Sequence, residues 1–288
     1  PRSTLFPYTT LFRSKHVVLI GLDGWGAYSL PKADMPNVKK LMEDGAYTLK
    51  KRSALPSSSA INWASMFMGA GPELHGYTEW GSKTPELPSR VLNKNGIFPT
   101  IFQLLRDARP KAEIGCLYEW NGIKYLVDTL SLNYHYHVAD YNKTPKELGN
   151  MASAYIKEKH PTLVAICYDN PDHTGHTEGH DTPGYYEKLK ELDTYVGQIV
   201  QAVKDAGILD DTIFILTSDH GGIKKGHGGK TMQEMETAFI ISGKNIKKGL
   251  RFDDVSMMQY DVASTIAHIF NLEQPQVWIG RPMKIGFK

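Results

Sequence analysis

Short apolar runs that alternate with helical patterns constrain the fold of this chain more than any other feature. Three of the runs occupy residues 16–22, 163–168 and 212–217, and nearly every residue in them is apolar. A strand that is apolar on both faces is typical of a parallel sheet with helices on both sides. The pattern therefore predicts an α/β fold, a three-layer α/β/α sandwich around a mostly parallel sheet.

The segments between these runs supply the helices and the remaining strands. A helix is expected to begin at Pro36 and to end by Gly45, because proline favours the first helical turn and glycine favours helix ends. Further helices are predicted over residues 59–68, 100–108, 146–159, 185–206 and 261–270, and further strands over 113–118 and 239–241. No repeat or linker interrupts this alternation, so one large domain is expected.

The first residues are interpreted separately. Residues 4–14 read TLFPYTTLFRS, which resembles an in-frame translation of a sequencing adapter. We therefore interpret residues 1–14 as non-native and residues 15–288 as a single catalytic domain with a minimal cap. A native signal peptide can have been lost in this way, so its absence does not indicate a cytoplasmic protein.

Composition excludes several classes of partner. The formal net charge of the 288 residues is only +2, which argues against a general surface for duplex nucleic acid or membrane. No apolar run approaches the roughly 18 residues of a membrane span. Cys116 and Cys167 both lie in apolar segments, so we expect buried free thiols.

Acidic residues stand directly after the apolar runs. Asp23, Asp172 and Asp219 each lie at or just past the end of a predicted strand. Ligands of such sheets gather at the carboxyl ends of the strands, so these carboxylates should share one edge. Nearby histidines are His176, His220 and His227. Mixed carboxylate and imidazole ligands suit two zinc-like ions, which together can stabilise a displacement at phosphorus.

A serine-rich turn supplies a candidate nucleophile. Residues 55–69 read LPSSSAINWASMFMG, in which the serines lead into the predicted helix. A serine at this position can simply cap the helix. Alternatively, Ser59 faces a metal ion, and the ion and the positive helix end together favour its alkoxide.

The same motifs resemble those of the alkaline phosphatase superfamily, most closely its type I nucleotide pyrophosphatase/phosphodiesterase family. The resemblance covers essentially residues 15–288. Its motifs are Leu22-Asp23-Gly24, Ser59-Ala60-Ile61-Asn62, GAGPELHG at 69–76, PDHTGH at 171–176, SDHG at 218–221 and GHG at 226–228.

The resemblance implies a site and a reaction. One divalent ion, zinc or alternatively manganese, would be bound by Asp172, His176 and His227. A second would be bound by Asp23, Asp219, His220 and the nucleophile Ser59. A small-molecule phosphate ester would be hydrolysed through a phosphoserine, with Asn62 and backbone amides near Ser59 binding a phosphate oxygen. The resemblance also favours a periplasmic or secreted protein, and it leaves the oligomeric state open.

Departures from the family pattern bear on the substrate. Serine replaces the usual threonine nucleophile, and Ala60 replaces the aromatic residue that stacks on a nucleobase. The short connection from His220 to His227 predicts a comparatively open site. The loss of the aromatic residue and the short connection favour substrates other than ordinary nucleotides, or an enzyme that accepts many leaving groups.

Several residues beside the motifs have two interpretations. Trp25, Trp63 and Trp80 either line an apolar subsite or pack in the core. Lys224, with neighbouring lysines, either contacts the substrate or belongs to a solvated loop. His173 and His180 are expected behind the ligands or at the surface.

We interpret the chain as a phosphodiesterase or nucleotide pyrophosphatase. The alternatives are a phosphomonoesterase, a sulfatase-like hydrolase and an inactive metal-binding homologue. The residues after Ser59 lack the proline and arginine of a sulfatase motif, which argues against the second alternative.

Overall fold

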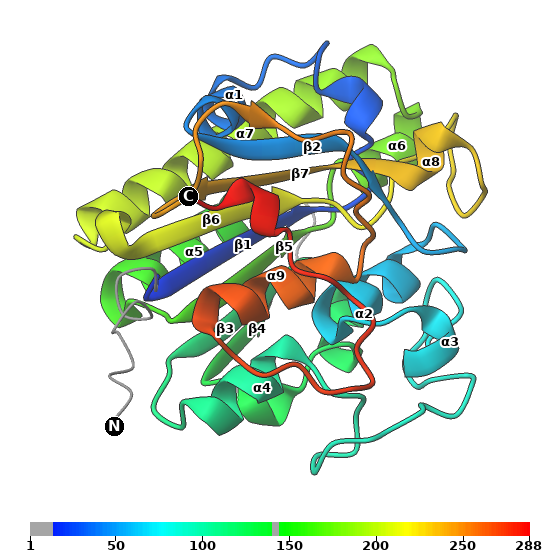
Figure 1. Cartoon of the computed structure of the whole chain (residues 1–288). Coiled ribbons are helices and arrows are strands. Elements are labelled where there is room, and N and C mark those ends of the chain that lie inside the picture. Colours follow the sequence, from blue (N-terminus) through cyan, green and yellow to red (C-terminus); the bar gives the residue numbers. More distant parts are fainter. Residues whose placement is uncertain (1–13, 140–143) are drawn as a thin grey trace.

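The computed structural model describes residues 14–139 and 144–288. Nearly all of the segment interpreted as adapter-derived, residues 1–14, lies outside the described residues. Within them, a mixed sheet of eight strands forms the middle layer (Figure 1). In spatial order the strands are β4 (Tyr134–His137), β3 (Ile114–Tyr118), β5 (Leu163–Tyr168), β1 (His16–Leu22), β6 (Thr212–Thr217), β7 (Glu236–Gly243), β2 (Gly45–Arg52) and β8 (Leu250–Arg251).

The sheet is mostly parallel, as predicted. The central strand β1 pairs in parallel with β5 and with β6, and β3 pairs in parallel with β5 and with β4. Strand β7 is antiparallel to both of its neighbours, β6 and β2. The carboxyl ends of β1, β5 and β6 therefore lie at one edge of the sheet.

Helices cover both faces of the sheet (Figure 1). Their bounds are α1 (Pro36–Glu43), α2 (Ser59–Met68), α3 (Pro72–His75), α4 (Ile101–Ala108), α5 (Lys146–Lys159), α6 (Asp172–Glu178), α7 (Pro183–Asp205), α8 (Met232–Met235) and α9 (Asp261–Phe270). One apolar core lies between the sheet and α2, α4 and α9, and the other lies beneath α1, α5 and α7.

Strand β1 explains why the sheet is buried on both sides. Val17 and Leu19 pack in the first core, whereas Val18, Ile20 and Leu22 pack in the second. Both faces of the strand are apolar, so it is stable only with helices on both sides. The predicted three-layer α/β/α sandwich is confirmed.

Two strands differ from the prediction. Residues 45–52 form β2, where only the end of a helix was expected. The strand was not predicted because the lysines at 50 and 51 and Arg52 interrupt any apolar run. Strand β7 extends over eight residues, well beyond the predicted 239–241. Cys116 and Cys167 are buried free thiols, as expected. Within the described residues, no helix has the length and apolar character needed to cross a membrane.

Helix α2 places the candidate nucleophile at its first residue. All ten residues of this helix are buried, from Ser59 to Met68. A helix that is covered on every side is held by packing rather than by its own propensity. Ser59 is therefore fixed at a positive helix end that lies beside the carboxyl edge of the sheet.

Candidate metal centre and active site

The acidic residues predicted at the strand ends converge. Asp23 follows β1, Asp219 follows β6, and Asp172 is the first residue of α6, just after β5. The turn after β1 needs Gly24, whose φ is +69° and whose position leaves no room for a Cβ beside Asp172. The backbone amide of Asp172 also donates to the carbonyl of Asp23, at 3.0 Å.

Asp23, Asp219, His220 and Ser59 form one half of the site. His220 Nε2 lies 3.4 Å from Asp23 Oδ1, 3.2 Å from Asp219 Oδ2 and 3.1 Å from Ser59 Oγ. The other oxygen of each carboxylate is occupied: Trp63 Nε1 donates to Asp23 at 2.9 Å, and Gly24 N donates to Asp219 at 3.1 Å. The two oxygens that face His220 are buried and accept no hydrogen bond.

Asp172, His176 and His227 form the other half. Asp172 Oδ2 lies 3.0 Å from His176 Nε2 and 3.6 Å from His227 Nε2. The His220 and His227 rings stack with centroids 3.8 Å apart, so the two halves adjoin. Two groups of side chains have ligand atoms close enough together to hold one ion each: Asp172, His176 and His227, and Asp23, Asp172 and His220. Asp172 is common to both groups and links the two halves.

The far side of each imidazole fixes its orientation. Nδ1 lies 2.9 Å from the Lys225 carbonyl in His176, 2.8 Å from the Gly221 carbonyl in His220 and 3.1 Å from the Ser57 carbonyl in His227. A backbone carbonyl at Nδ1 places the proton there and leaves Nε2 as an acceptor toward the site. Three such imidazoles and three buried carboxylates fit divalent ions that prefer N and O ligands.

The pKa values of the carboxylates also indicate a site for cations. Burial, with Asp219 and Asp172 nearby, raises the pKa of Asp23 well above its usual range. Burial and then Asp172 raise the pKa of Asp219 to about 7. Burial opposes ionisation of Asp172 too, but its contacts with His176 and other histidines hold its pKa well below the usual value. Three carboxylates so close together need positive charge between them.

This crowding predicts how stability depends on pH when no metal is bound. The pKa of Asp219 is raised to about 7 and that of His176, by its contact with Asp172, to about 9. Both groups bind more protons in the native state than in the unfolded state, so their contribution is present at low pH and lost as pH rises. We expect the free energy of unfolding of metal-free protein to fall from about pH 6 to about pH 9.

Urea unfolding at three pH values, with chelator and with zinc, measures this effect. Zinc should largely remove the fall, because the ions replace the protons. A metal-free protein that becomes more stable between pH 6 and pH 9 would contradict the electrostatic account.

The structure corrects the expected role of Asn62. Its side chain is completely buried, and its Oδ1 accepts from the Ala54 amide at 2.6 Å. Its Nδ2 lies 3.1 Å from the Ala54 and Pro56 carbonyls and 3.0 Å from that of Ser58. Asn62 therefore braces the loop before Ser59 and does not reach a substrate oxygen. The Ala60 amide is also engaged, at 3.1 Å from the Trp80 carbonyl.

The tryptophans separate into two kinds. Trp25 and Trp63 are at most 1% exposed and belong to the apolar cores, so they line no subsite. Trp80 is 67% exposed and lines a pocket over the site, which favours the subsite over the core among its two interpretations. Trp120 lines the same pocket, although no sequence motif adjoins it and it was not predicted as a site residue.

The pocket over the site has a volume of about 270 Å³. Its lining residues are Ser59, Trp80, Trp120, Asp169, Asp172, His173, His176 and His227. His173 is thus at the surface and in the pocket. Lys224 is exposed and does not line it, which favours the interpretation as a solvated loop.

His180 lies behind a ligand. It is 4% exposed, and its Nε2 is 3.5 Å from Asp172 Oδ1. A Cβ on Gly175 or Gly222 would meet the His180 ring at 2.4 or 2.3 Å, so both glycines leave space for it. Of the two interpretations for His180, the structure supports the position behind the ligands.

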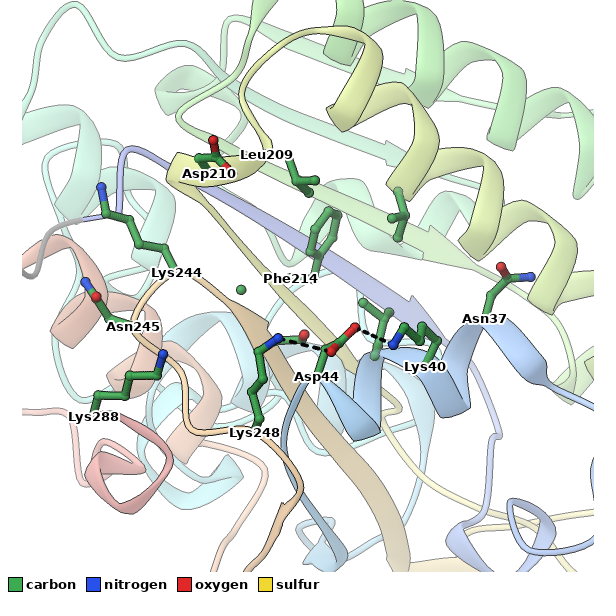
Figure 2. A pocket seen from close by; sticks show the side chains of 14 residues that line it. Asn37, Lys40, Asp44, Leu209, Asp210, Phe214, Lys244, Asn245, Lys248 and Lys288 are labelled. Atoms are coloured by element: carbon green, nitrogen blue, oxygen red, sulfur yellow. Dashed lines mark hydrogen bonds and ion pairs between the residues drawn. The ribbon is translucent and has the colours of Figure 1, made fainter.

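A larger pocket, of about 460 Å³, lies at the opposite end of the sheet (Figure 2). Phe214 points into it, and Asp44 stands between Lys40 and Lys248, with ion pairs of 3.1 and 3.3 Å. None of its lining residues belongs to the metal-ligand cluster. The smaller pocket is therefore the candidate active site.

Known structures share the fold. The chain superimposes on murine ectonucleotide pyrophosphatase/phosphodiesterase 5 with a TM-score of 0.73 at 16% identity, covering 91% of this chain and 96% of that one. A 2-O GAG sulfatase matches with a TM-score of 0.76 at 14% identity, covering 94% of this chain and 73% of the sulfatase.

Sequence comparison identifies the family of the chain. Mouse bis(5'-adenosyl)-triphosphatase enpp4 is 26% identical in an alignment 216 residues long that covers 71% of this chain and 46% of that protein. Mouse ectonucleotide pyrophosphatase/phosphodiesterase family member 1 is 24% identical in an alignment 220 residues long that covers 73% of this chain and 24% of that protein. The alignments thus span between a quarter and half of these relatives. The family model for type I phosphodiesterase/nucleotide pyrophosphatase matches residues 17–237, and the chain belongs to that family.

Proposed function

We propose that this chain hydrolyses phosphodiesters or pyrophosphates at a site for two divalent ions, with Ser59 as the nucleophile. One observation carries the proposal. Three imidazoles fixed through Nδ1 turn Nε2 toward the buried carboxylates of Asp23, Asp172 and Asp219, each of which has one oxygen without a hydrogen bond. Ser59 Oγ lies 3.1 Å from His220 Nε2. Burying such oxygens without partners is costly unless cations bind them.

The two halves of the site would each hold one ion. Asp172, His176 and His227 would hold the first, and Asp23, Asp219, His220 and Ser59 would hold the second. Zinc fits this mixture of imidazole and carboxylate ligands best, and manganese is the alternative. Such ions, when bound, supply positive charge that favours a serine alkoxide and stabilises the phosphate oxygens.

The protein's own residues then determine the reaction geometry. Ser59 is held at the first turn of α2, where the positive helix end also favours an alkoxide. Its oxygen bonds to phosphorus as the bond to the leaving group breaks, which gives a phosphoserine. Water attacks the same phosphorus in the second displacement, its oxygen replaces that of Ser59, and the serine is regenerated.

The pocket lining favours a diester over a monoester. Among the described residues, those that line the pocket include no lysine or arginine, but they include the carboxylate of Asp169. A monoester dianion gains most from an additional cation, whereas a diester carries a single charge. The diester is thus the better match to this pocket.

The tryptophans predict the substrate preference. The side chain of Ala60 is buried, so it gives no surface for a base, and Trp80 and Trp120 are the aromatic residues at the pocket. We expect a simple alkyl aryl phosphodiester to be hydrolysed with a kcat/KM within about a hundredfold of that for a nucleotide aryl ester, since stacking on one ring contributes about 1–3 kcal/mol.

Steady-state kinetics with the two esters measure this ratio. Trp120→Ala should lower kcat/KM for aryl esters by about tenfold, and Trp25→Phe, which alters a core tryptophan, serves as the control. A nucleotide preference above about a thousandfold would show a base-binding pocket elsewhere.

A substrate panel tests the proposed function itself. Metal-loaded protein is assayed with phosphodiesters, nucleotide pyrophosphates, phosphomonoesters and sulfate esters. Faster hydrolysis of the first two classes is expected. A preference for monoesters or sulfates would replace the proposal with the corresponding alternative, and no turnover of any ester would indicate an inactive homologue.

A further inference from the structure

A lysine lies completely buried beneath the site. Lys51 is on β2, next to a register shift in its pairing with β7, and its exposed fraction is zero. Lysine is almost never fully buried, because removing an ammonium from water is costly unless it is paired. A fully buried lysine therefore calls for a specific role.

The Lys51 ammonium donates to two groups around the metal ligands. Its Nζ donates to the Ser218 carbonyl at 2.8 Å, directly before Asp219 and His220, and also to Gln259 Oε1. Burial lowers the pKa of Lys51 to about 7, an effect that the negative charge of Asp219 opposes. The lysine thus holds the turn that carries two of the second-ion ligands.

Gln259 extends this contact to the nucleophile helix. It is fully buried, and its Nε2 donates to the carbonyls of Asn62 at 3.2 Å and Ser218 at 3.3 Å. Its backbone amide donates to the Arg52 carbonyl at 2.8 Å, which keeps it beside β2. Asn62 in turn braces the loop before Ser59.

We propose that Lys51 is a positioning residue that, through Ser218 and Gln259, fixes the Asp219–His220 turn relative to Ser59. The carbonyl of Ser218 belongs to one side of the second-ion site and that of Asn62 to the helix that begins with Ser59. Joining them sets the distance between the nucleophile and the ligands of its ion. Small errors in that distance cost large factors in rate.

Lys51→Met tests this role because it keeps the volume and removes both donated hydrogen bonds. Substituting a residue that supports a metal ligand typically weakens metal binding by about 10- to 100-fold. The Kd of the second ion should therefore rise at least about tenfold in Lys51→Met. kcat for an aryl phosphodiester should fall about thirtyfold or more, with KM within about threefold. Isothermal titration of metal-free protein with zinc and steady-state kinetics at saturating zinc give the two readouts.

A double-mutant cycle separates positioning from general destabilisation. If Lys51 and Gln259 form one bridge, Gln259→Leu should impair both readouts, and the double variant should be no worse than Lys51→Met alone. Lys51→Arg, which keeps the charge and the donors, should restore kcat to within about tenfold of wild type. The matched control is Thr217→Val, at the residue directly before Ser218. This change removes a buried hydrogen bond to the Ala238 carbonyl, so it should lower the stability of the protein without changing the metal affinity or kcat.

The possible results divide cleanly. A Lys51→Met protein that binds the second ion as tightly as wild type, or more tightly, with kcat within about threefold, overturns the proposal. If that variant does not fold, an unchanged second-ion Kd in Gln259→Leu overturns it instead. The metal readout rests on the two-ion site of the proposed function, and the kcat readout rests on its reaction as well, so a wild type that binds two ions without hydrolysing phosphodiesters leaves the metal titration to decide.

Discussion

Replacing Ser59 with alanine should lower kcat for an aryl phosphodiester by at least about a thousandfold and leave the fold unchanged. The change removes the one oxygen that lies both at the start of α2 and 3.1 Å from His220 Nε2. No other hydroxyl among the described residues has both contacts. Stopped-flow or steady-state release of p-nitrophenol at saturating metal measures the loss.

The neighbouring serine provides the control. Ser58 Oγ lies 3.4 Å from His227 Nδ1, which already has the closer Ser57 carbonyl, so Ser58→Ala should keep activity within about tenfold. A Ser59→Ala variant that retains more than about a tenth of wild-type activity would exclude Ser59 as the nucleophile.

Replacing Asp172 with asparagine should abolish activity and reduce the bound metal to at most one ion per chain. Asp172 is the residue common to both candidate metal groups, so its charge contributes to both. It also contacts two of the imidazoles, at 3.0 and 3.6 Å. Elemental analysis after zinc loading and gel filtration measures the stoichiometry.

Asp193→Asn is the matched control for a buried carboxylate. Asp193 accepts hydrogen bonds from the Val38 amide at 2.8 Å and the Asn37 amide at 3.0 Å, at the start of α1. This variant should be less stable but should still bind two ions. If Asp172→Asn also bound two ions with wild-type affinity, the assignment of the shared ligand would be wrong.

The fold could be predicted because its central strands are apolar on both faces. β1, β5 and β6 admit no arrangement except burial between two helical layers, and an acidic residue that follows each strand must lie at the carboxyl edge. Strand β2 could not be predicted in the same way. Its lysines are incompatible with an apolar run, and the burial of Lys51 depends on Gln259, more than two hundred residues further along the chain.

Local sequence predicted which residues meet at the site but not how each one is oriented. The carbonyls that orient His176 and His227 belong to Lys225 and Ser57, which lie far from them in the sequence, in loops whose course depends on the whole fold. For the same reason the orientation of Asn62 was not predicted: it stands in a family motif, but its side chain points into its own loop. Trp120 reaches the pocket from a turn after β3, and no motif marks that position.

Phosphodiester turnover during a zinc titration tests the central claim most directly. Metal-free wild type is loaded with increasing equivalents of zinc, and the rate of p-nitrophenol release from an aryl phosphodiester is measured at each step. A two-ion site with Ser59 as nucleophile predicts little activity at one equivalent and full activity at two, with none from Ser59→Ala at any loading. Full activity at one equivalent, or no hydrolysis at two, would contradict it.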